Sequence, residues 1–374
     1  MTGIDEVGTL VRKDEMMLLS DLLKQMIDLK ASDIFVVAGL PLTYKVSGRQ
    51  VRMNGEPLTP ASTRTVVEAI YEIAGRDFNN FDNNDNLDED FSFALPGIGR
   101  FRANVFRQRG SVSAVIRVIP FGLPDPEELH IPQSVLDLAD LTKGLVLVTG
   151  PAGSGKSTTL ACIIDRINRE RNRHIITLED PIEYVHRHEK CIVTQREVPT
   201  DIATYAEGLR SAMRESPDII LLGEMRDAET IGIAITAAEM AQLIFSTLHT
   251  NSAAGTIDRI IDAFPAEQRH MIRMQLSLVL QAVVSQQLVP AIDGTVLPVF
   301  EIMVANPAIR NLIREEKTYQ IDSVIAAGSR QGMRTMDQSL FELVKDGKIT
   351  IETALSHAIH PSALDHRLEA EKLK

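Results

Sequence analysis

The sequence has few cysteines and no excess of positive charge. Its 374 residues include only two cysteines, Cys162 and Cys191, which lie far apart and form no Cys-x-x-Cys pair. A structural zinc site built from cysteines is therefore excluded, and so few thiols are typical of a protein in the reducing cytoplasm. The formal net charge is −12. This charge argues against a general nucleic-acid binder, whose affinity comes largely from neutralising phosphates, although a local basic groove remains compatible with it.

Long apolar runs are also missing. The longest nearly apolar stretch runs from Ile231 to Leu248 and contains Glu239 and Gln242. A membrane-spanning helix needs about 20 apolar residues, so we interpret this stretch as a helix followed by a strand. The first residues, MTGIDEVGTLVRKDE, are charged and include no apolar core segment, so we expect no secretory signal there.

What the sequence does contain is a glycine-rich phosphate-binding motif that matches G-x-x-x-x-G-K-[ST]. The motif follows the apolar run GLVLVTG and precedes a segment with helical spacing of apolar residues, which is the strand–loop–helix context it requires. Glycines let backbone N–H groups turn toward one point, and a helix N-terminus adds partial positive charge. The sequence therefore predicts a nucleotide site in which Lys156 reaches the β- and γ-phosphates and the Ser157 hydroxyl binds Mg²⁺. The predicted binding residues are Gly150, Pro151, Ala152, Gly153, Ser154, Gly155, Lys156, Ser157 and Thr158.

Two domains are predicted, joined by a linker rich in proline. The linker runs from Pro120 to Pro132 and also contains Pro124 and Pro126. Before it the pattern is mixed α+β, and after it strands alternate with helices, which predicts a parallel sheet with crossover helices. The predicted parts are a loose leader at residues 1–15, a small domain at 16–119, the linker at 120–132 and an α/β domain at 133–374.

The small domain is predicted from short segments in which apolar residues recur either at helical spacing or at every second position. Apolar residues at helical spacing indicate helices, and alternation around the turn Gln108–Gly110 indicates a β-hairpin with one apolar face. The acidic, turn-rich segment Asn79–Asp90 is predicted to be a loop. The predicted elements are helices at 16–30 and 61–73, strands at 33–37 and 41–46, and a hairpin of 100–105 with 112–118.

The second domain is predicted from five apolar runs with helical patterns between most of them. After Asn306 the chain has a mostly helical pattern. The predicted strands are Leu145–Thr149, His174–Leu178, Cys191–Gln195, Ile219–Leu222 and Leu243–Leu248; the predicted helices are 157–171, 204–214, 228–241, 308–315, 319–327, 335–346 and 351–359.

Three further stretches place reactive side chains at the ends of predicted strands, where open α/β sheets bind ligands. In ITLEDPIEY, Glu179, Asp180 and Glu183 follow a strand, and a carboxylate there can hold Mg²⁺ or accept a proton from water. In PDIILLGEMRD, the apolar strand ends at Glu224, which is the Walker-B arrangement. In STLHTNSA, His249 follows a strand and is a candidate contact for the γ-phosphate. Surface turns with acidic residues and structural histidines are the alternative interpretations.

Arginines form the last candidate set, because phosphoryl transfer is accelerated when an arginine neutralises charge in the transition state. Surface ion pairs are the alternative role for most of them. The candidates are Arg210, Arg214, Arg226 and Arg259 in the second domain and Arg100, Arg102, Arg107 and Arg117 in the hairpin.

Taken together, GPAGSGKST, ITLEDPIEY, PDIILLGEMRD and STLHTNSAAGTIDRII resemble the Walker A, Asp-box, Walker B and His-box motifs of the secretion-ATPase superfamily. The later stretch AIRNLIRE, residues 308–315, resembles the motif of the type IV pilus retraction ATPases, the PilT family. Order and spacing agree from about Leu19 to the C-terminal helices. Ala152 is a departure, since the family usually has Thr there, but this position offers its backbone to the phosphates.

The resemblance implies a hexameric ring of two-domain subunits, with a PAS-like N-terminal domain and a RecA-like motor domain. By motif position, Glu183 would be the general base, Glu224 the Walker-B carboxylate and metal ligand, and His249 the histidine coupled to the γ-phosphate. The AIRNLIRE helix would have an apolar face of Ala308, Ile309, Leu312 and Ile313, with Arg310 and Arg314 on one side. The arginines implied at the site are Arg210, Arg214 and Arg259, with Arg102 and Arg117 completing it when the ring closes.

From this resemblance we expect a cytoplasmic ATPase that uses ATP and Mg²⁺ to drive type IV pilus retraction, and so twitching motility, at an inner-membrane platform protein. An accessory retraction paralogue and a pilus-extension or secretion ATPase are the alternatives. Extension and secretion relatives usually carry a four-cysteine zinc element and a longer N-terminal domain, which this sequence lacks. A RecA-like nucleic-acid motor belongs to another class, and the acidic charge and the lack of an aromatic–basic stretch argue against it.

Overall fold

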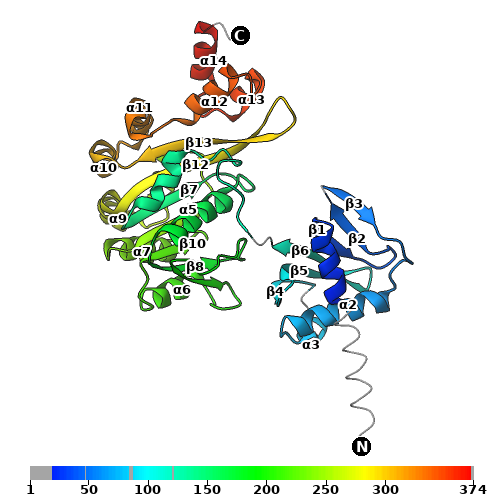
Figure 1. Ribbon diagram of the computed structural model, residues 1–374. Coiled ribbons are helices and arrows are strands. Elements are labelled where there is room, and N and C mark those ends of the chain that lie inside the picture. Colours follow the sequence, from blue (N-terminus) through cyan, green and yellow to red (C-terminus); the bar gives the residue numbers. More distant parts are fainter. Residues whose placement is uncertain (1–18, 47, 84–86, 120–121, 372–374) are drawn as a thin grey trace, which may run out of the picture. The chain divides into compact units, whose positions relative to one another are not determined.

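The computed structural model describes residues 19–371 except 47, 84–86 and 120–121 (Figure 1). The predicted leader, residues 1–15, lies outside the described residues, as does the beginning of the first predicted helix, which is seen at 19–28. The described residues form two compact units, one mainly of residues up to Gly122 and one mainly of residues from Leu123 onward.

The first unit is an antiparallel sheet with strand order β3-β2-β1-β6-β5-β4, and helix α2 packs on β6. The predicted hairpin is confirmed as β5 and β6, with Phe101, Ala103 and Val105 buried on one face. Its turn residues Arg109 and Gly110 both have positive φ, 49° and 77°, as two-residue hairpin turns require. The elements are β1 Ala31–Val36, β2 Thr43–Val46, β3 Arg49–Arg52, α2 Pro60–Ile73, α3 Phe78–Asn83, β4 Asp88–Leu95, β5 Gly99–Gln108 and β6 Ser111–Ile119.

The prediction of one loop at Asn79–Asp90 was wrong. Helix α3 begins before this segment, and the edge strand β4 begins within it. The reason is a group of aromatic residues around Tyr71, whose ring centroid lies 5.3 Å from that of Phe78 and 4.9 Å from that of Phe91. Burial of these rings stabilises the helix and the strand, while Asp88 and Asp90 of β4 are exposed.

The second unit is a seven-stranded sheet with the order β13-β12-β7-β11-β10-β8-β9. The five predicted strands are confirmed within two residues at each end, and their neighbours run parallel. Helix α5 packs on one face of the sheet with Val146 and Val148, and helices α6–α9 pack on the other with Leu145 and Leu147. The strands are β7 Gly144–Thr149, β8 His174–Glu179, β9 Ile192–Glu197, β10 Ile219–Leu222, β11 Leu243–Leu248, β12 Leu280–Pro290 and β13 Val296–Val304.

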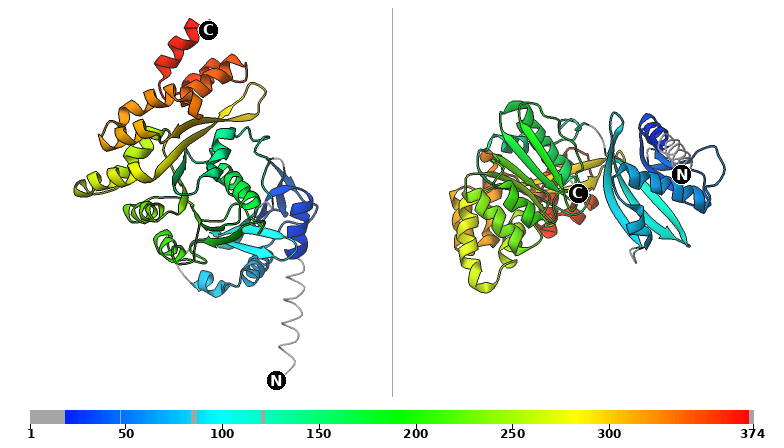
Figure 2. Two further views of the ribbon diagram at one scale, coloured as in Figure 1. Left: turned by 60° about the vertical axis from the view of Figure 1, so that its left-hand side comes forward. Right: turned by 90° about the horizontal axis from the view of Figure 1, so that it is seen from below.

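Strands β12 and β13 were not predicted. Strand β12 lies parallel to β7, and β13 lies antiparallel to β12 at the edge of the sheet. The C-terminal helices gather at this edge, as the orange and red segments of Figures 1 and 2 show. The helices are α4 Gln133–Leu136, α5 Lys156–Glu170, α6 Tyr205–Ala212, α7 Ala228–Glu239, α8 Ala253–Asp262, α9 Ala266–Val279, α10 Pro307–Arg314, α11 Ile321–Ala327, α12 Met336–Lys345, α13 Ile351–His357 and α14 Pro361–Ala370.

The helical predictions for the C-terminal region are largely confirmed. Helix α10 is the AIRNLIRE helix, and Ile309 and Ile313 are buried with Leu312 packed beside them. Ala308 was wrongly assigned to its apolar face, because it is exposed in the first turn. Among the described helices, none combines the length and the apolar character needed to cross a membrane.

Candidate nucleotide-binding site

The glycine-rich loop joins the buried strand β7 to helix α5, as predicted. Gly150, Gly153 and Gly155 have φ of 145°, 75° and 87°, a region that side chains with a Cβ disfavour. Space is also limiting, since a Cβ on Gly150 would lie 2.1 Å from the carbonyl oxygen of Gln286. The loop can therefore take this path only with glycine at its first position.

The loop holds its lysine close to its own backbone. The Lys156 Nζ donates hydrogen bonds to the carbonyl oxygens of Gly150, at 3.0 Å, and Pro151, at 2.9 Å. The Ser154 hydroxyl is buried and has no hydrogen-bond partner among the described residues, whereas Ser157 is exposed in the first turn of α5. A buried hydroxyl of this kind and the N-terminus of α5 fit a phosphate, which would supply the missing acceptor.

Strand β12 supports the loop from the neighbouring position in the sheet. The Thr159 hydroxyl of α5 donates to Gln286 Oε1 at 2.7 Å in a buried position. One residue earlier, the hydroxyls of Ser285 and Thr149 lie 3.0 Å apart. The sequence analysis missed these residues, because β12 itself was not predicted.

The ends of β10 and β11 bring Glu224 and His249 together. The Glu224 carboxylate lies 3.5 Å from His249 Nε2 and also forms an ion pair with Arg226, whose pKa is raised by that contact. Two hydrogen bonds join the strand ends. Met225 N donates to the Thr247 carbonyl oxygen at 3.2 Å, and the Thr247 hydroxyl donates to the Gly223 carbonyl oxygen at 2.6 Å. The Glu224 side chain is 14% exposed, so its charge is partly shielded from water.

The end of β8 carries the ITLEDPIEY carboxylates. Glu179 accepts hydrogen bonds from the Thr177 hydroxyl at 2.6 Å and from Gln195 Nε2 at 3.2 Å. After the turn, Ile182 N donates to the buried carboxylate of Glu197 at 3.0 Å, and Glu183 is exposed. Neutral and backbone donors thus hold Glu179 and Glu197, while Glu183 faces solvent.

Tyr205, the first residue of α6, was missed by the sequence analysis. A Cβ on Gly223 would lie 2.7 Å from its hydroxyl oxygen, so the phenol reaches the strand end that carries Glu224. Burial raises the pKa of Tyr205, and the charges of Asp180 and Glu224 raise it further. No sequence motif marks this tyrosine, whose position follows from how α6 packs on β8 and β10.

The candidate arginines separate into distinct environments. Arg226 contacts Glu224, whereas Arg210 forms an ion pair with Glu229 of α7. Arg214 donates to the carbonyl oxygen of Arg210 at 3.0 Å, and Arg259 is exposed on α8. In the first unit, the hairpin arginines form ion pairs: Arg102 with Asp90, Arg107 with Asp82 and Arg117 with Asp33.

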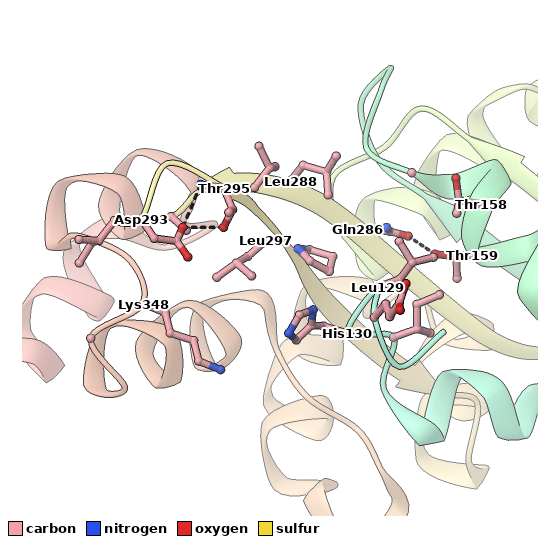
Figure 3. A pocket seen from close by; sticks show the side chains of 18 residues that line it. Leu129, His130, Thr158, Thr159, Gln286, Leu288, Asp293, Thr295, Leu297 and Lys348 are labelled. Atoms are coloured by element: carbon pink, nitrogen blue, oxygen red, sulfur yellow. Dashed lines mark hydrogen bonds between the residues drawn. The ribbon is translucent and has the colours of Figure 1, made fainter. Parts of the chain in front are cut away.

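A cavity of about 830 Å³ opens beside the glycine-rich loop (Figure 3). Its walls come from the segment 128–131, the first turn of α5 and the β12–β13 hairpin. Its apolar side is formed by Leu288, Leu297 and Pro298, and its polar groups include the side chains of Thr158 and Gln286. An apolar slot with a few polar groups suits a flat heterocycle next to the phosphate loop. The sequence analysis predicted Gly155 and Thr158 as binding residues but did not identify the walls from 128–131 and the β12–β13 hairpin.

Comparisons with known proteins show which family this chain belongs to. The family model described as Type II/IV secretion system protein matches residues 127–296. The type IV pilus retraction ATPase PilT of Pseudomonas aeruginosa is 49% identical over 335 residues, which cover 88% of this chain and 95% of that protein. This chain belongs to the PilT family of secretion ATPases.

Two further comparisons support membership of the PilT family. The type IV pilus ATPase PilU of Pseudomonas aeruginosa is 42% identical over 349 residues, covering 93% of this chain and 90% of that protein. The crystal structure of the pilus retraction motor PilT with bound ADP has a TM-score of 0.85 and 45% identity, covering 93% of this chain and 98% of that one. The two-unit α/β ATPase fold is therefore shared along almost the whole chain.

Proposed function

We propose that this chain is a subunit of an ATP-driven motor for type IV pilus retraction. One observation carries the proposal. In this PilT-family chain, the glycine-rich loop with its buried Lys156 and Ser154 follows one strand of the sheet, and the Glu224–His249 pair follows two other strands of that sheet. The related structure was determined with ADP, which supports a nucleotide as the ligand. In this proposal the second unit is a RecA-like motor domain and the first a PAS-like domain.

Binding of ATP is expected to use the loop and the cavity beside it. The triphosphate would take the hydrogen bonds of backbone N–H groups, while Lys156 Nζ exchanges its carbonyl partners for phosphate oxygens. The base would enter the cavity between Leu288 and the segment 128–131. Because burial there is mostly apolar, the cavity adds affinity for the base without adding charge.

Ser157 and Glu224 are the residues that would hold Mg²⁺. The described residues contain no group of three His, Cys, Asp or Glu side chains able to hold a metal by themselves. This fits Mg²⁺, which is usually bound by one or two protein ligands together with phosphates and water. When bound, Mg²⁺ would neutralise charge on the phosphate oxygens.

For hydrolysis we assign Glu183 as the general base. It would accept a proton from the water whose oxygen attacks the γ-phosphorus, while the bond to the ADP oxygen breaks. His249 would contact the γ-phosphate, and its proximity to Glu224 would transmit the loss of that phosphate to the ends of β10 and β11. Asp180 and Glu179 lie close in sequence, but Glu179 is already held by two donors.

Arginines are expected to complete the site in a homohexamer. Arg210, Arg214 and Arg259 would act from the motor domain, and Arg102 and Arg117 from the first unit of a neighbouring subunit. The ion pairs of Arg102 with Asp90 and of Arg210 with Glu229 lie at the surface and contribute little to stability, so exchange of the carboxylate for a phosphate has a small energetic cost. Arg117 pairs with the buried carboxylate of Asp33, so its release would cost more. The motor would work at the cytoplasmic face of the inner membrane on a pilus platform protein, and nucleic acid is not a proposed partner.

Substitution of Glu183 by Gln tests the proposal. We expect phosphate release dependent on Mg²⁺ to fall about 100-fold or more, while binding of a fluorescent ATP analogue stays within about twofold of the parent. Glu189→Gln, at an exposed position six residues later in the same segment, is the matched control and should behave as the parent. Parent-rate hydrolysis by the Glu183→Gln protein would show that the base is another residue.

An accessory retraction ATPase is the second candidate, because the chain is also 42% identical to PilU. The two roles differ in what a cell loses without the protein. Deletion of the gene should abolish pilus retraction if this chain is the main motor and leave retraction measurable if it is an accessory one. Retraction force and frequency, observed on labelled pili, separate the two outcomes.

A further inference from the structure

One buried carboxylate of the second unit joins two helix N-termini. Glu301 lies on β13 and is 1% exposed. One of its oxygens accepts a hydrogen bond from Ala253 N at 2.7 Å, and the other accepts one from Met336 N at 3.3 Å. Ala253 is the first residue of α8 and Met336 the first residue of α12. A carboxylate at a helix N-terminus is favourable for both helices, so Glu301 holds them at one point.

Helix α8 is directly joined to the His249 side of the site. The connection between β11 and α8 is only four residues, 249–252. Within it, the Ser252 side chain caps Gly255 N at 3.2 Å, and the hydroxyls of Thr250 and Thr256 lie 2.7 Å apart. Because this loop is short and bonded to the first turn of α8, a shift of Ala253 would move the loop that carries His249.

The sheet joins the same groups by a second route. In strand register, Leu248 of β11 faces Thr149 of β7, Thr149 faces Ser285 of β12, and Ser285 faces Glu301 of β13. This row passes the residues that immediately precede His249 and the glycine-rich loop. Glu301 therefore lies in the same row of the sheet as Leu248 and Thr149, after which the His249 loop and the glycine-rich loop begin.

On the other side, Glu301 borders the C-terminal helices. A cavity of about 280 Å³ is lined by Glu301, Asp322, Asp337 and His360, and His360 Nε2 lies 3.1 Å from a carboxylate oxygen of Asp322. Asp337 accepts hydrogen bonds from the backbone N–H groups of Ile359 and His360. Burial raises the pKa of Glu301 to about 7, although the hydrogen bonds from the two backbone N–H groups lower it. The charges of Asp322 and Asp337 add to the rise.

We propose that Glu301 is a positioning residue for hydrolysis, which fixes the His249 loop to the C-terminal helices through the N-termini of α8 and α12. The inference rests on the proposed ATPase function for its kinetic consequence, but its structural consequence does not. While both carboxyl oxygens of Glu301 accept the hydrogen bonds of these two N–H groups, the loop is restrained. When Glu301 is replaced, or when ionisation draws its carboxyl group toward water, α8 and α12 are released from each other, and displacement of the C-terminal helices no longer reaches His249.

Glu301→Gln in the full chain is the first test. We expect kcat for ATP to fall about tenfold and KM to stay within about twofold, because His249 acts on the γ-phosphate in the transition state rather than in binding. The dependence of kcat on pH near 7 should also disappear. Glu267→Gln, an exposed glutamate in the first turn of α9, is the control and should keep the parent values. Parent kcat and pH profile in Glu301→Gln would overturn the inference.

Amide hydrogen exchange of the nucleotide-free protein is the second test and needs no catalysis. In Glu301→Gln, exchange in residues 250–258 should be about tenfold faster, with α5 unchanged. In the parent, protection of 250–258 relative to α5 should decrease as the pH is raised from 6 to 8, because ionisation of the buried Glu301 favours openings that expose it to water. This measurement decides even if the variant does not fold. Equal protection at both pH values would overturn the role of Glu301. A parent that exchanges as expected but does not hydrolyse ATP would instead contradict the proposed function.

Discussion

The carboxylate of Glu224 lies 3.5 Å from Nε2 of His249, and each residue follows the end of one of two adjacent parallel strands. Hydrogen bonds between the strand ends, from Met225 to Thr247 and from Thr247 to Gly223, hold this geometry. Such preorganisation matters because groups that are already in place cost no rearrangement when charge develops. The pair therefore provides a fixed contact between the residue that we propose as a metal ligand and the one that we propose as a γ-phosphate contact.

His249→Ala should separate hydrolysis from nucleotide binding. Loss of a single electrostatic contact to the transferred phosphoryl group is expected to lower kcat by about 10²–10³-fold, with ATP affinity changed less than about threefold. Phosphate release and equilibrium binding, measured on the same preparations, check this. His270→Ala on α9 is a suitable control because His270 is exposed. Equal losses in kcat and in affinity would show that His249 contributes to ground-state binding instead.

Lys156→Ala should abolish both binding and turnover. The amine is buried against the loop carbonyls of Gly150 and Pro151, so it is held where the phosphates are expected. We expect ATP affinity to fall about 100-fold and phosphate release to reach background. Binding is measured by titration with a fluorescent nucleotide. Lys143→Ala, an exposed lysine just before β7, is the control, and comparable loss there would indicate a general effect of charge.

Two glycines of the loop should differ in their tolerance of alanine. A Cβ on Gly150 meets the backbone oxygen of Gln286 at 2.1 Å, whereas one on Gly153 meets nothing within 4 Å. Gly150→Ala is therefore expected to destabilise the second unit by about 3 kcal/mol or more, and Gly153→Ala by about 1–2 kcal/mol from its left-handed backbone. Thermal unfolding of the two variants tests this order. If Gly153→Ala is the less stable one, the close approach of β12 to the loop is not the limiting factor.

The core strands and the motifs could be predicted because their signals are local. Each central parallel strand is a short apolar run, and Glu224 and His249 follow within two residues of such runs, so both were assigned to strand ends from sequence alone. Strand β12 could not be found in this way. It is buried on both faces between β7 and β13, so it shows no alternation, and no glycine or proline separates it from α9.

Because β12 was not predicted, part of the candidate site was not predicted either. Gln286, Leu288 and the hairpin side of the cavity come from β12 and β13, and their roles depend on pairing with β7 far away in sequence. The position of Tyr205 likewise depends on packing of α6 rather than on a motif. In the first unit, the charged residues of Asn79–Asp90 dominated the local pattern, although burial of Phe78 and Phe91 decides the fold there.

Arg310 gives the AIRNLIRE helix a structural role that can be measured. Its guanidinium donates to the carbonyl oxygens of Ser277, at 2.6 Å, and Leu278, at 2.8 Å, at the end of α9, and burial lowers its pKa. Arg310→Ala leaves these carbonyls without their donor, so we expect a loss of about 2 kcal/mol and a Tm lower by roughly 4–8 °C. Arg314→Ala is the control, because Arg314 contacts Asn311 of its own helix. Equal Tm values for both variants would contradict the capping role.

The ionisation of Glu301 should make stability depend on pH in a direction opposite to that of an ordinary ion-paired carboxylate. Its pKa rises from 4.5 to about 7 on folding, so the folded protein retains a proton that the unfolded chain releases. Raising the pH from 4.5 toward 7 therefore lowers the contribution of Glu301 to the free energy of unfolding. This loss of stability is complete above pH 7. The Tm of the parent minus that of Glu301→Gln should become smaller as the pH is raised from 5 to 8, as measured by calorimetry in buffers of equal ionic strength. A difference that is constant across this range would show that Glu301 has the same pKa in the folded and unfolded chain.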